Sequence, residues 1–188
     1  MQALFTRIAK NKTIMTTTEN IKFIKLPESF KADLGSFSID PSIELPILLG
    51  KGKDKVEDKD LTVENIVAGM ISVIAHDKDN PNFSYYKAFV LASDPNIVEK
   101  LNQAAIAKEQ RKEFEFAEEL FLAVYHLLPQ SASCINLATL YSYLAVEARS
   151  KDEDDKPWIK KVRSTLLDGI ERFGEDEMIL SELFSFEA

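Results

Sequence analysis

The fold is decided by residues 101–129, which read LNQAAIAKEQRKEFEFAEELFLAVYHLLP. In the second half of this stretch, apolar residues recur three or four positions apart, which places them along one stripe of a helix. They are Phe114, Ala117, Phe121, Val124 and Leu128, and Leu120 and Leu127 widen the stripe. Acidic residues at or near the start suit the positive end of the helix dipole, and a proline stops the helix. The acids are Glu113, Glu115, Glu118 and Glu119, and the proline is Pro129.

A partner helix is predicted just upstream, over residues 97–109. Its inward residues are Val98, Leu101, Ala104 and Ala105, and the polar run 108–113 supplies the turn. Two helices approach closely where one contributes a small residue, and Ala105 and Ala117 are placed for such a contact. The stretch therefore predicts a helical hairpin.

Two patterns in this region resemble the tetratricopeptide repeat (TPR), a helical-hairpin repeat. Residues 136–141, Asn-Leu-Ala-Thr-Leu-Tyr, resemble the first-helix signature, and Ala105 precedes Ala138 by 33 positions, one short of the family period. The second-helix spacing is carried by Ala117, Phe121, Val124 and Pro129, and its first three positions are repeated by Val162, Leu166 and Gly169.

The resemblance covers about residues 97–174 and departs from the family pattern in places. Lys108 stands where a Tyr is expected, Leu101 replaces a bulky aromatic, and extra residues separate Tyr141 from Trp158. The resemblance implies an all-α fold, a stack of antiparallel helix hairpins with an extended or short β segment at the N-terminus.

Further helices are predicted on both sides of this region. One spans residues 61–77 with Thr62 as its cap, and another spans 83–92. A third spans 158–173, starting after Pro157 and stopping at Gly174, and residues 175–186 cover the end of the stack. Gly69 marks the first helix of an early, degenerate hairpin. Residues 61–188 are therefore expected to form one helical domain.

The N-terminal third follows a different pattern. Apolar residues alternate around Pro41 and Pro46, so residues 21–60 predict an extended strap or small hairpin followed by a charged, mobile loop. A free strand there would be an edge for strand addition. Residues 1–20 are expected to be a disordered tail or to precede a start at Met15, with an organellar presequence as the alternative.

Composition limits the partners. The 188 residues carry a net charge of −8, which disfavours nucleic acid and membrane surfaces and favours basic peptides or proteins. The single cysteine, Cys134, cannot form an internal disulfide and lies among apolar residues, so a buried, inert thiol in the cytoplasm is expected.

No catalytic set is apparent in the sequence. His76 and His126 each fall at the end of a predicted helix, where a structural role is favoured. An acidic cluster invites a calcium site, but Pro81 and a missing glycine break the EF-hand pattern. Its members are Asp77, Asp79, Asn80 and Asn82. We expect no cofactor, no metal and no catalysis.

Three functions are compatible with the sequence. The first is a TPR-like adaptor that binds a peptide or partner protein, and its groove residues are predicted to be Asn102, Lys108, Asn136 and Tyr143. These residues can also be ordinary solvated helix surface. The second is a small acidic TPR chaperone for a secreted or assembled client. The third is an enzyme with a site between the strap and the helices. Homo-oligomerisation stays open.

Overall fold

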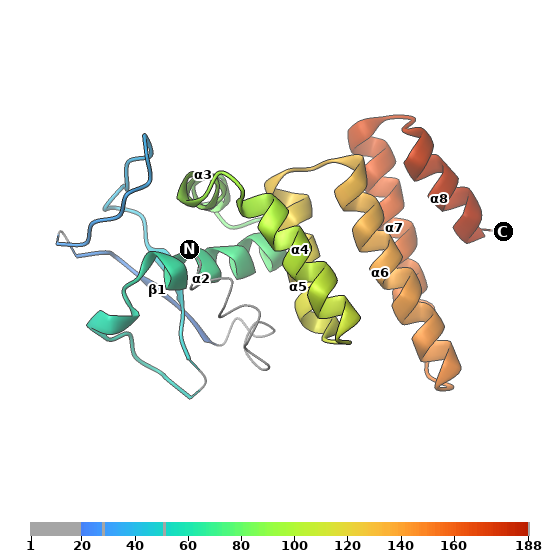
Figure 1. Cartoon of the computed structure of the whole chain (residues 1–188), viewed down its shortest axis with the longest axis horizontal. Helices are drawn as coiled ribbons and strands as arrows, with labels where there is room; N and C mark the ends of the chain where they lie inside the picture. Colours follow the sequence, from blue (N-terminus) through green and yellow to red (C-terminus); the bar gives the residue numbers. More distant parts are fainter. Residues whose placement is uncertain (1–19, 28, 51, 188) are drawn as a thin grey trace. The chain divides into compact units, whose positions relative to one another are not determined.

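The structure is a computed structural model that describes residues 20–27, 29–50 and 52–187 (Figure 1). It is helical with a two-stranded antiparallel sheet near its start, which confirms the predicted all-α class with a short β segment. The predictions for the N-terminal tail and for a start at Met15 lie outside the described residues. The chain divides into two compact units, Met1–Leu127 and Leu128–Ala188, called here the first and second unit. None of the helices in the described part is long and apolar enough to cross a bilayer.

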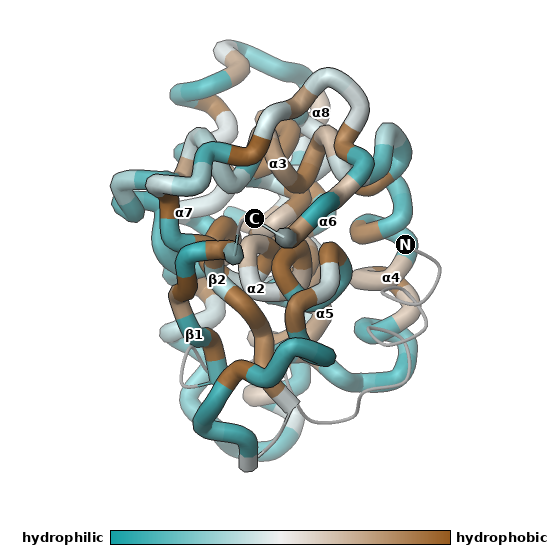
Figure 2. The backbone as a smooth tube through the Cα atoms, turned by 90° about the vertical axis from the view of Figure 1, so that its left-hand side faces the viewer, coloured by the Kyte–Doolittle hydropathy of each residue, from teal (hydrophilic) through white to brown (hydrophobic). Residues whose placement is uncertain are grey.

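The first unit begins with the predicted strap. Strand β1 (Ile21–Ile24) pairs with β2 (Leu45–Leu48), with Ile21 opposite Leu48. Strand β2 is buried throughout and packs on helix α2 (Val63–His76), and both elements are largely hydrophobic (Figure 2). A Cβ added at Gly69 would lie 2.4 Å from the Pro46 carbonyl oxygen, so the glycine admits the strand backbone. The close neighbour of Gly69 is therefore a strand, where we expected a helical hairpin.

The strap is also fastened to helix α3 (Phe83–Ser93). The Tyr86 hydroxyl donates to the Glu44 carbonyl oxygen at 2.7 Å, and the Asp40 amide donates to the Tyr85 hydroxyl at 2.9 Å. The Phe37 ring meets Tyr85 with 5.3 Å between ring centroids. Two side chains of α3 thus hold the segment between the strands against the helices.

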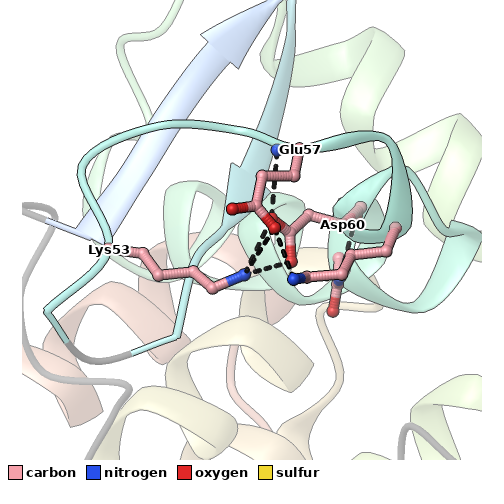
Figure 3. A network of polar contacts seen from close by, with 5 residues as sticks. Lys53, Glu57 and Asp60 are labelled. Carbon is pink, nitrogen blue, oxygen red and sulfur yellow. Dashed lines mark hydrogen bonds and ion pairs between the residues drawn. The ribbon is translucent and has the colours of Figure 1, made fainter.

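The charged loop before α2 is organised by its own side chains (Figure 3). Lys53 Nζ donates to both carboxylate oxygens of Asp60, at 2.9 and 3.0 Å, and lies 3.8 Å from Glu57 Oε2. The bond from Lys53 lowers the pKa of Asp60. The short 3-10 helix η2 (Asp58–Asp60) lies within this network, and Asn65 Nδ2 donates to the Asp60 carbonyl oxygen at 2.8 Å. The loop predicted to be mobile is therefore tied to the start of α2.

Helix α2 starts where the sequence predicted. Thr62 is its N-cap, and its hydroxyl oxygen accepts from the Asn65 amide at 3.2 Å. That bond satisfies one of the amides that a helix leaves without an internal partner. The identity of residue 62 was therefore sufficient to predict where α2 begins.

Helices α4 (Ile97–Gln110) and α5 (Phe114–Leu127) form the predicted hairpin. Its inner stripe is buried at Leu101, Ala105 and Ala117, each at 0% exposure, but Leu128, which was predicted to extend the stripe, is 45% exposed beyond the end of α5. Helix α5 also packs on α2, whereas α3 and α4 share only a small contact. The core of the first unit therefore lies between β2, α2 and α5.

The second unit consists of helices α6 (Ser131–Ser150), α7 (Lys156–Phe173) and α8 (Glu177–Glu187), which pack side by side (Figure 1). Pro157 lies in the first turn of α7, and Gly174 ends that helix with φ 74°. Both signals were read correctly from the sequence. The extra residues before Trp158 mostly continue α6, and only five residues, 151–155, connect it to α7.

The α4–α5 hairpin and the α6–α7 hairpin close with the same turn. After α4, the Lys112 amide donates to the Glu109 carbonyl and the Glu113 amide to the Lys108 carbonyl. After α6, the Asp152 amide donates to the Arg149 carbonyl and the Glu153 amide to the Ala148 carbonyl. The left-handed residue in each turn has φ 59°. These are two copies of the Schellman motif, each built without glycine.

Candidate functional site

A groove of about 560 Å³ opens on the second unit. All three helices of this unit contribute to its wall. The lining residues are Ser142, Ala145, Val146 and Arg149 of α6, Ile159 and Arg163 of α7, and Glu182, Ser185, Phe186 and Glu187 of α8. Its volume lies within the range of ordinary ligand pockets.

The groove exposes apolar surface. Val146 is 64% exposed, an unusual state for a valine whose neighbours Leu144 and Ala145 are buried. Ile159 and Phe186 are half-buried in the same lining. Apolar side chains gathered in a concave surface favour contact with another molecule more than scattered exposed ones do.

Two arginines in the groove are held by carboxylates of the same unit. Arg163 donates from Nε and Nη2 to the two oxygens of Glu187, at 2.8 and 2.6 Å. Arg149 donates from Nε to Asp155 Oδ2 at 2.9 Å, and its Nη2 lies 2.7 Å from the same oxygen. Such pairs compensate the arginine charges locally.

Glu182 is different. Within the part of the chain that the structure describes, its carboxylate forms no hydrogen bond and no ion pair, and it lines the groove. The charge that the groove leaves uncompensated is therefore negative.

The groove lies on a part of α6 that the first hairpin does not have. Ala105 and Ala138 are 33 positions apart, but the left-handed residues Lys112 and Asp152 are 40 apart. Helix α6 thus has seven additional residues before its closing turn, here called the α6 extension, residues 144–150. Seven residues are close to two full turns, so the inward face of α6 stays in phase along the extension. Ala145, Val146 and Arg149 all belong to it.

The four residues predicted to line a groove lie in different places. Asn102 and Lys108 belong to α4 of the first unit, and Asn136 and Tyr143 belong to α6 of the second. Asn136 and Tyr143 are seven positions apart, so they share one stripe of α6. Tyr143 is 42% exposed and lies one turn before Val146. Asn102 and Lys108 are six positions apart, so they lie on different faces of α4.

Lys108 is buried, with 2% exposure. Its Nζ donates to Glu113 Oε2 at 2.6 Å and lies 4.7 Å from the centroid of the Phe116 ring. Both contacts lie within the α4–α5 hairpin. A partner would reach the Lys108 ammonium only after this pair opened, so the residue stabilises the turn in the observed structure.

Glu119 is a buried acid that the sequence did not reveal. It lies on the α5 face that packs against α2, at 0% exposure, and neither carboxylate oxygen has a hydrogen-bond partner among the described residues. Burial raises the pKa of Glu119 to about 8. The Ser72 hydroxyl partly offsets this effect, although its geometry falls short of a hydrogen bond. Burial therefore favours the protonated form of this carboxyl and closes it to a substrate.

The histidines lie in the first unit. His76 Nε2 is 4.0 Å from Glu119 Oε1, with the imidazole 39% exposed. His126 Nδ1 lies 2.6 Å from the Ile74 carbonyl oxygen, a contact between α5 and α2. Both side chains therefore contribute to the packing of helix ends, as their positions in the sequence suggested.

Cys134 is buried at 0% exposure in the second unit. Its Sγ donates to the Thr165 carbonyl oxygen at 3.3 Å, and burial raises the pKa of the thiol to about 11. A thiol with this pKa is poorly nucleophilic. The expectation of a buried cysteine is confirmed.

The acidic cluster after α2 uses its side chains for turns. Asn80 Nδ2 donates to Asp77 Oδ2 at 3.0 Å, and the Asn82 amide donates to Asn80 Oδ1 at 3.0 Å. Over residues 20–187, leaving aside 28 and 51, no group of three or more His, Cys, Asp or Glu side chains is arranged to hold a metal ion.

A smaller cavity of about 270 Å³ lies within the strap. It is lined by Leu26, Pro27, Phe30, Ile39 and Pro41. These side chains supply no acid, base or nucleophile, so the cavity offers little support for an enzyme site beside the strap.

Known proteins do not identify the chain. No protein-family model matches it, no curated protein does, and no solved structure does.

None of the ten lining residues was predicted as a site residue, and none of the predicted residues Asn102, Lys108, Asn136 and Tyr143 lines this groove. The sequence does contain a signal for Val146. Residues 144–146 are all apolar, and Leu144 and Ala145 already occupy the inner face of α6, so Val146 must point away from that face. Glu182 and Phe186 carry no comparable local signal, since their place in the groove depends on how α8 packs.

Proposed function

We propose that the chain is a non-catalytic adaptor that binds a segment of a partner protein in the groove of the second unit. The observation that carries this proposal is the 64% exposure of Val146 inside a groove formed by three helices. An apolar side chain kept open at the centre of a concave surface gains free energy when a partner covers it.

The resemblance to TPR hairpins supports the same function, because helical hairpins of that kind present grooves to peptides. The repeated Schellman turn adds to this resemblance, since two hairpins of one chain close in the same way. Of the four residues predicted from the sequence, Tyr143 fits the proposal best, because it lies next to Val146 along α6.

The chemistry of the groove favours binding over catalysis. The ionisable side chains in its lining are Arg149, Arg163, Glu182 and Glu187, and both arginines are paired. The histidines and the cysteine of the chain are used elsewhere. We place this adaptor in the cytoplasm, because a lone cysteine is compatible with a reducing compartment.

The test is site-specific photo-crosslinking. A photoreactive side chain at position 146 is expected to capture a partner in cells, and the same side chain at Leu167 is the control. Leu167 is 50% exposed on α7 of the same unit and does not line the groove. Capture must be lost when the partner is competed by unlabelled wild-type protein.

A pair of point variants tests the same surface without a crosslinker. Val146→Glu should abolish association with the captured partner, because it places a charge inside the groove. Leu167→Glu adds the same charge to an exposed helix position outside the groove, so it should leave association unchanged. Equal loss with both variants, or capture from position 167 alone, would show that the groove is not the binding site.

A further inference from the structure

We propose that the occupant of the groove is an amphipathic helix with a basic polar face, whose lysine or arginine pairs with Glu182. This inference rests on the proposed function and adds the chemistry of the partner. It is argued from the groove wall, from its charges and from its apolar centre.

The groove wall favours a helix over an extended peptide. All ten lining residues belong to α6, α7 or α8, whose amides and carbonyls bordering the groove are paired within those helices except for the last carbonyls of α8. An extended peptide would find no row of free amides and carbonyls there, and its own backbone would stay unpaired. A helix satisfies its backbone internally, so it needs only side-chain contacts.

The size of the apolar centre fits about two turns of such a helix. Ser142 and Arg149 mark the ends of the α6 side of the groove, and seven residues of helix span about 10 Å. Val146 lies between them and faces the same space as Ile159 and Phe186. Apolar residues three and four positions apart on the occupant would cover this centre.

The charge of the occupant follows from which charged side chains of the groove already have a partner. Arg163 is bound by Glu187 and Arg149 by Asp155, so an acidic helix would compete with a carboxylate of the same unit for each guanidinium. Glu182 has no such partner in the described part of the chain and can accept a cation directly. Residues 128–188 also contain twelve acidic and seven basic side chains, so the field around the groove attracts cations.

The experiment uses three synthetic peptides of about fifteen residues, which is about four turns of helix. They share one leucine and alanine stripe, and their polar positions carry only Lys, only Gln or only Glu. Trp158 is the single tryptophan of the chain and directly precedes the groove residue Ile159, so its fluorescence reports binding when the peptides contain none.

The Lys peptide is expected to bind about tenfold more tightly than the Glu peptide at low salt, with the Gln peptide between them. This advantage should shrink as the salt concentration rises to about 0.5 M, because exposed charges are then screened. Glu182→Gln should weaken the Lys peptide by about two- to fivefold. The matched control is Glu171→Gln, which removes the same charge from an exposed position of α7 outside the groove and should have a smaller effect.

The possible failures are distinguishable. If the three peptides bind equally and Val146→Asn, which adds no charge, weakens all of them, the basic partner is wrong and the groove stands. If the Lys peptide binds but Val146→Asn has no effect, both this inference and the proposed function are overturned. If none of the peptides binds, the basic helical occupant is wrong, and capture from position 146 decides the proposed function separately. Equal losses with Glu182→Gln and Glu171→Gln would remove the assignment to Glu182.

Discussion

The α4–α5 hairpin of the first unit and the α6–α7 hairpin of the second share a turn but differ in length and surroundings. Both close with the same Schellman motif, yet α6 is 20 residues long and α4 is 14. In the first unit, α2 covers the outer face of α5 and buries Glu119. Ala117 of α5 corresponds to Val162 of α7, 45 positions later, so Glu119 corresponds to Ser164. Ser164 is exposed. What packs beside a hairpin therefore decides which of its residues belong to the core.

The largest expected effect on stability comes from disrupting the packing of β2 on α2, the helix that covers α5. Gly69→Ala places a Cβ 2.4 Å from the Pro46 oxygen, and backbone cannot move aside as a side chain can. We expect the free energy of unfolding to fall by about 3 kcal/mol, measured by urea denaturation with hydrogen exchange of the α2 amides. Gly50→Ala is the control, because nothing lies within 4 Å of its Cβ, and it should change stability by less than about 0.5 kcal/mol. Equal effects of the two variants would mean that the contact with β2 is not tight.

Glu119→Gln tests how the burial of Glu119 under α2 makes stability depend on pH. The pKa of Glu119 is about 8 in the folded chain and its ordinary value is 4.5, so the folded state keeps a proton that the unfolded state has released. This contribution to stability is complete below about pH 4.5 and is lost as the pH rises to about 8. The Gln variant does not titrate and should become more stable than the wild type across this window, by about 2 kcal/mol at pH 8.

The comparison needs a control on the same helix. Glu115→Gln removes a carboxylate from an exposed position of α5 and should not produce this pH dependence. A wild-type profile parallel to that of the Gln variant would show that Glu119 is ionised in the folded state.

A smaller effect is expected at the matching contact of the second unit. A Cβ at Gly169 would lie 2.5 Å from Cys134 Sγ and 3.1 Å from Ile179 Cδ1. These are side-chain atoms that can shift, so Gly169→Ala should cost about 1–2 kcal/mol, less than Gly69→Ala. In the double variant with Cys134→Ala the sulfur is absent, and part of the loss from Gly169→Ala should be recovered. Trp158 fluorescence reports this unit, and additive losses in the double variant would contradict the contact.

These contrasts show which features the sequence could predict. Thr62, Pro157 and Gly174 mark helix ends through bonds or backbone angles formed within a few residues, and the structure places each as predicted. Spacing also predicts the buried positions Leu101, Ala117 and Phe121 of the α4–α5 hairpin, because a helix has a fixed period. It fails at Leu128, which is 45% exposed because α5 has already ended at Leu127.

Burial on the outer faces could not be predicted in this way. Glu119 looked like one of several acids suited to a helix start, and only the packing of α2 on α5 makes it part of the core. The residues between Tyr141 and Trp158 depart from the family spacing, yet those up to Ser150 continue α6 and only residues 151–155 connect it to α7. The groove depends on both this extension and the position of α8, so no single segment of sequence contains it.

The smallest expected effect concerns the turn that the two hairpins share. Lys112 and Asp152 both have φ 59°, a left-handed conformation that costs a residue with a side chain more than glycine. Lys112→Gly should therefore stabilise the first unit by about 1 kcal/mol, and Asp152→Gly should stabilise the second by about half as much, because Asp tolerates this region better. Lys112→Ala removes the lysine side chain without relieving the backbone, so it should give no gain. Thermal unfolding measures each change, and equal gains from Lys112→Gly and Lys112→Ala would show that the lysine side chain, and not the backbone angle, carries the cost.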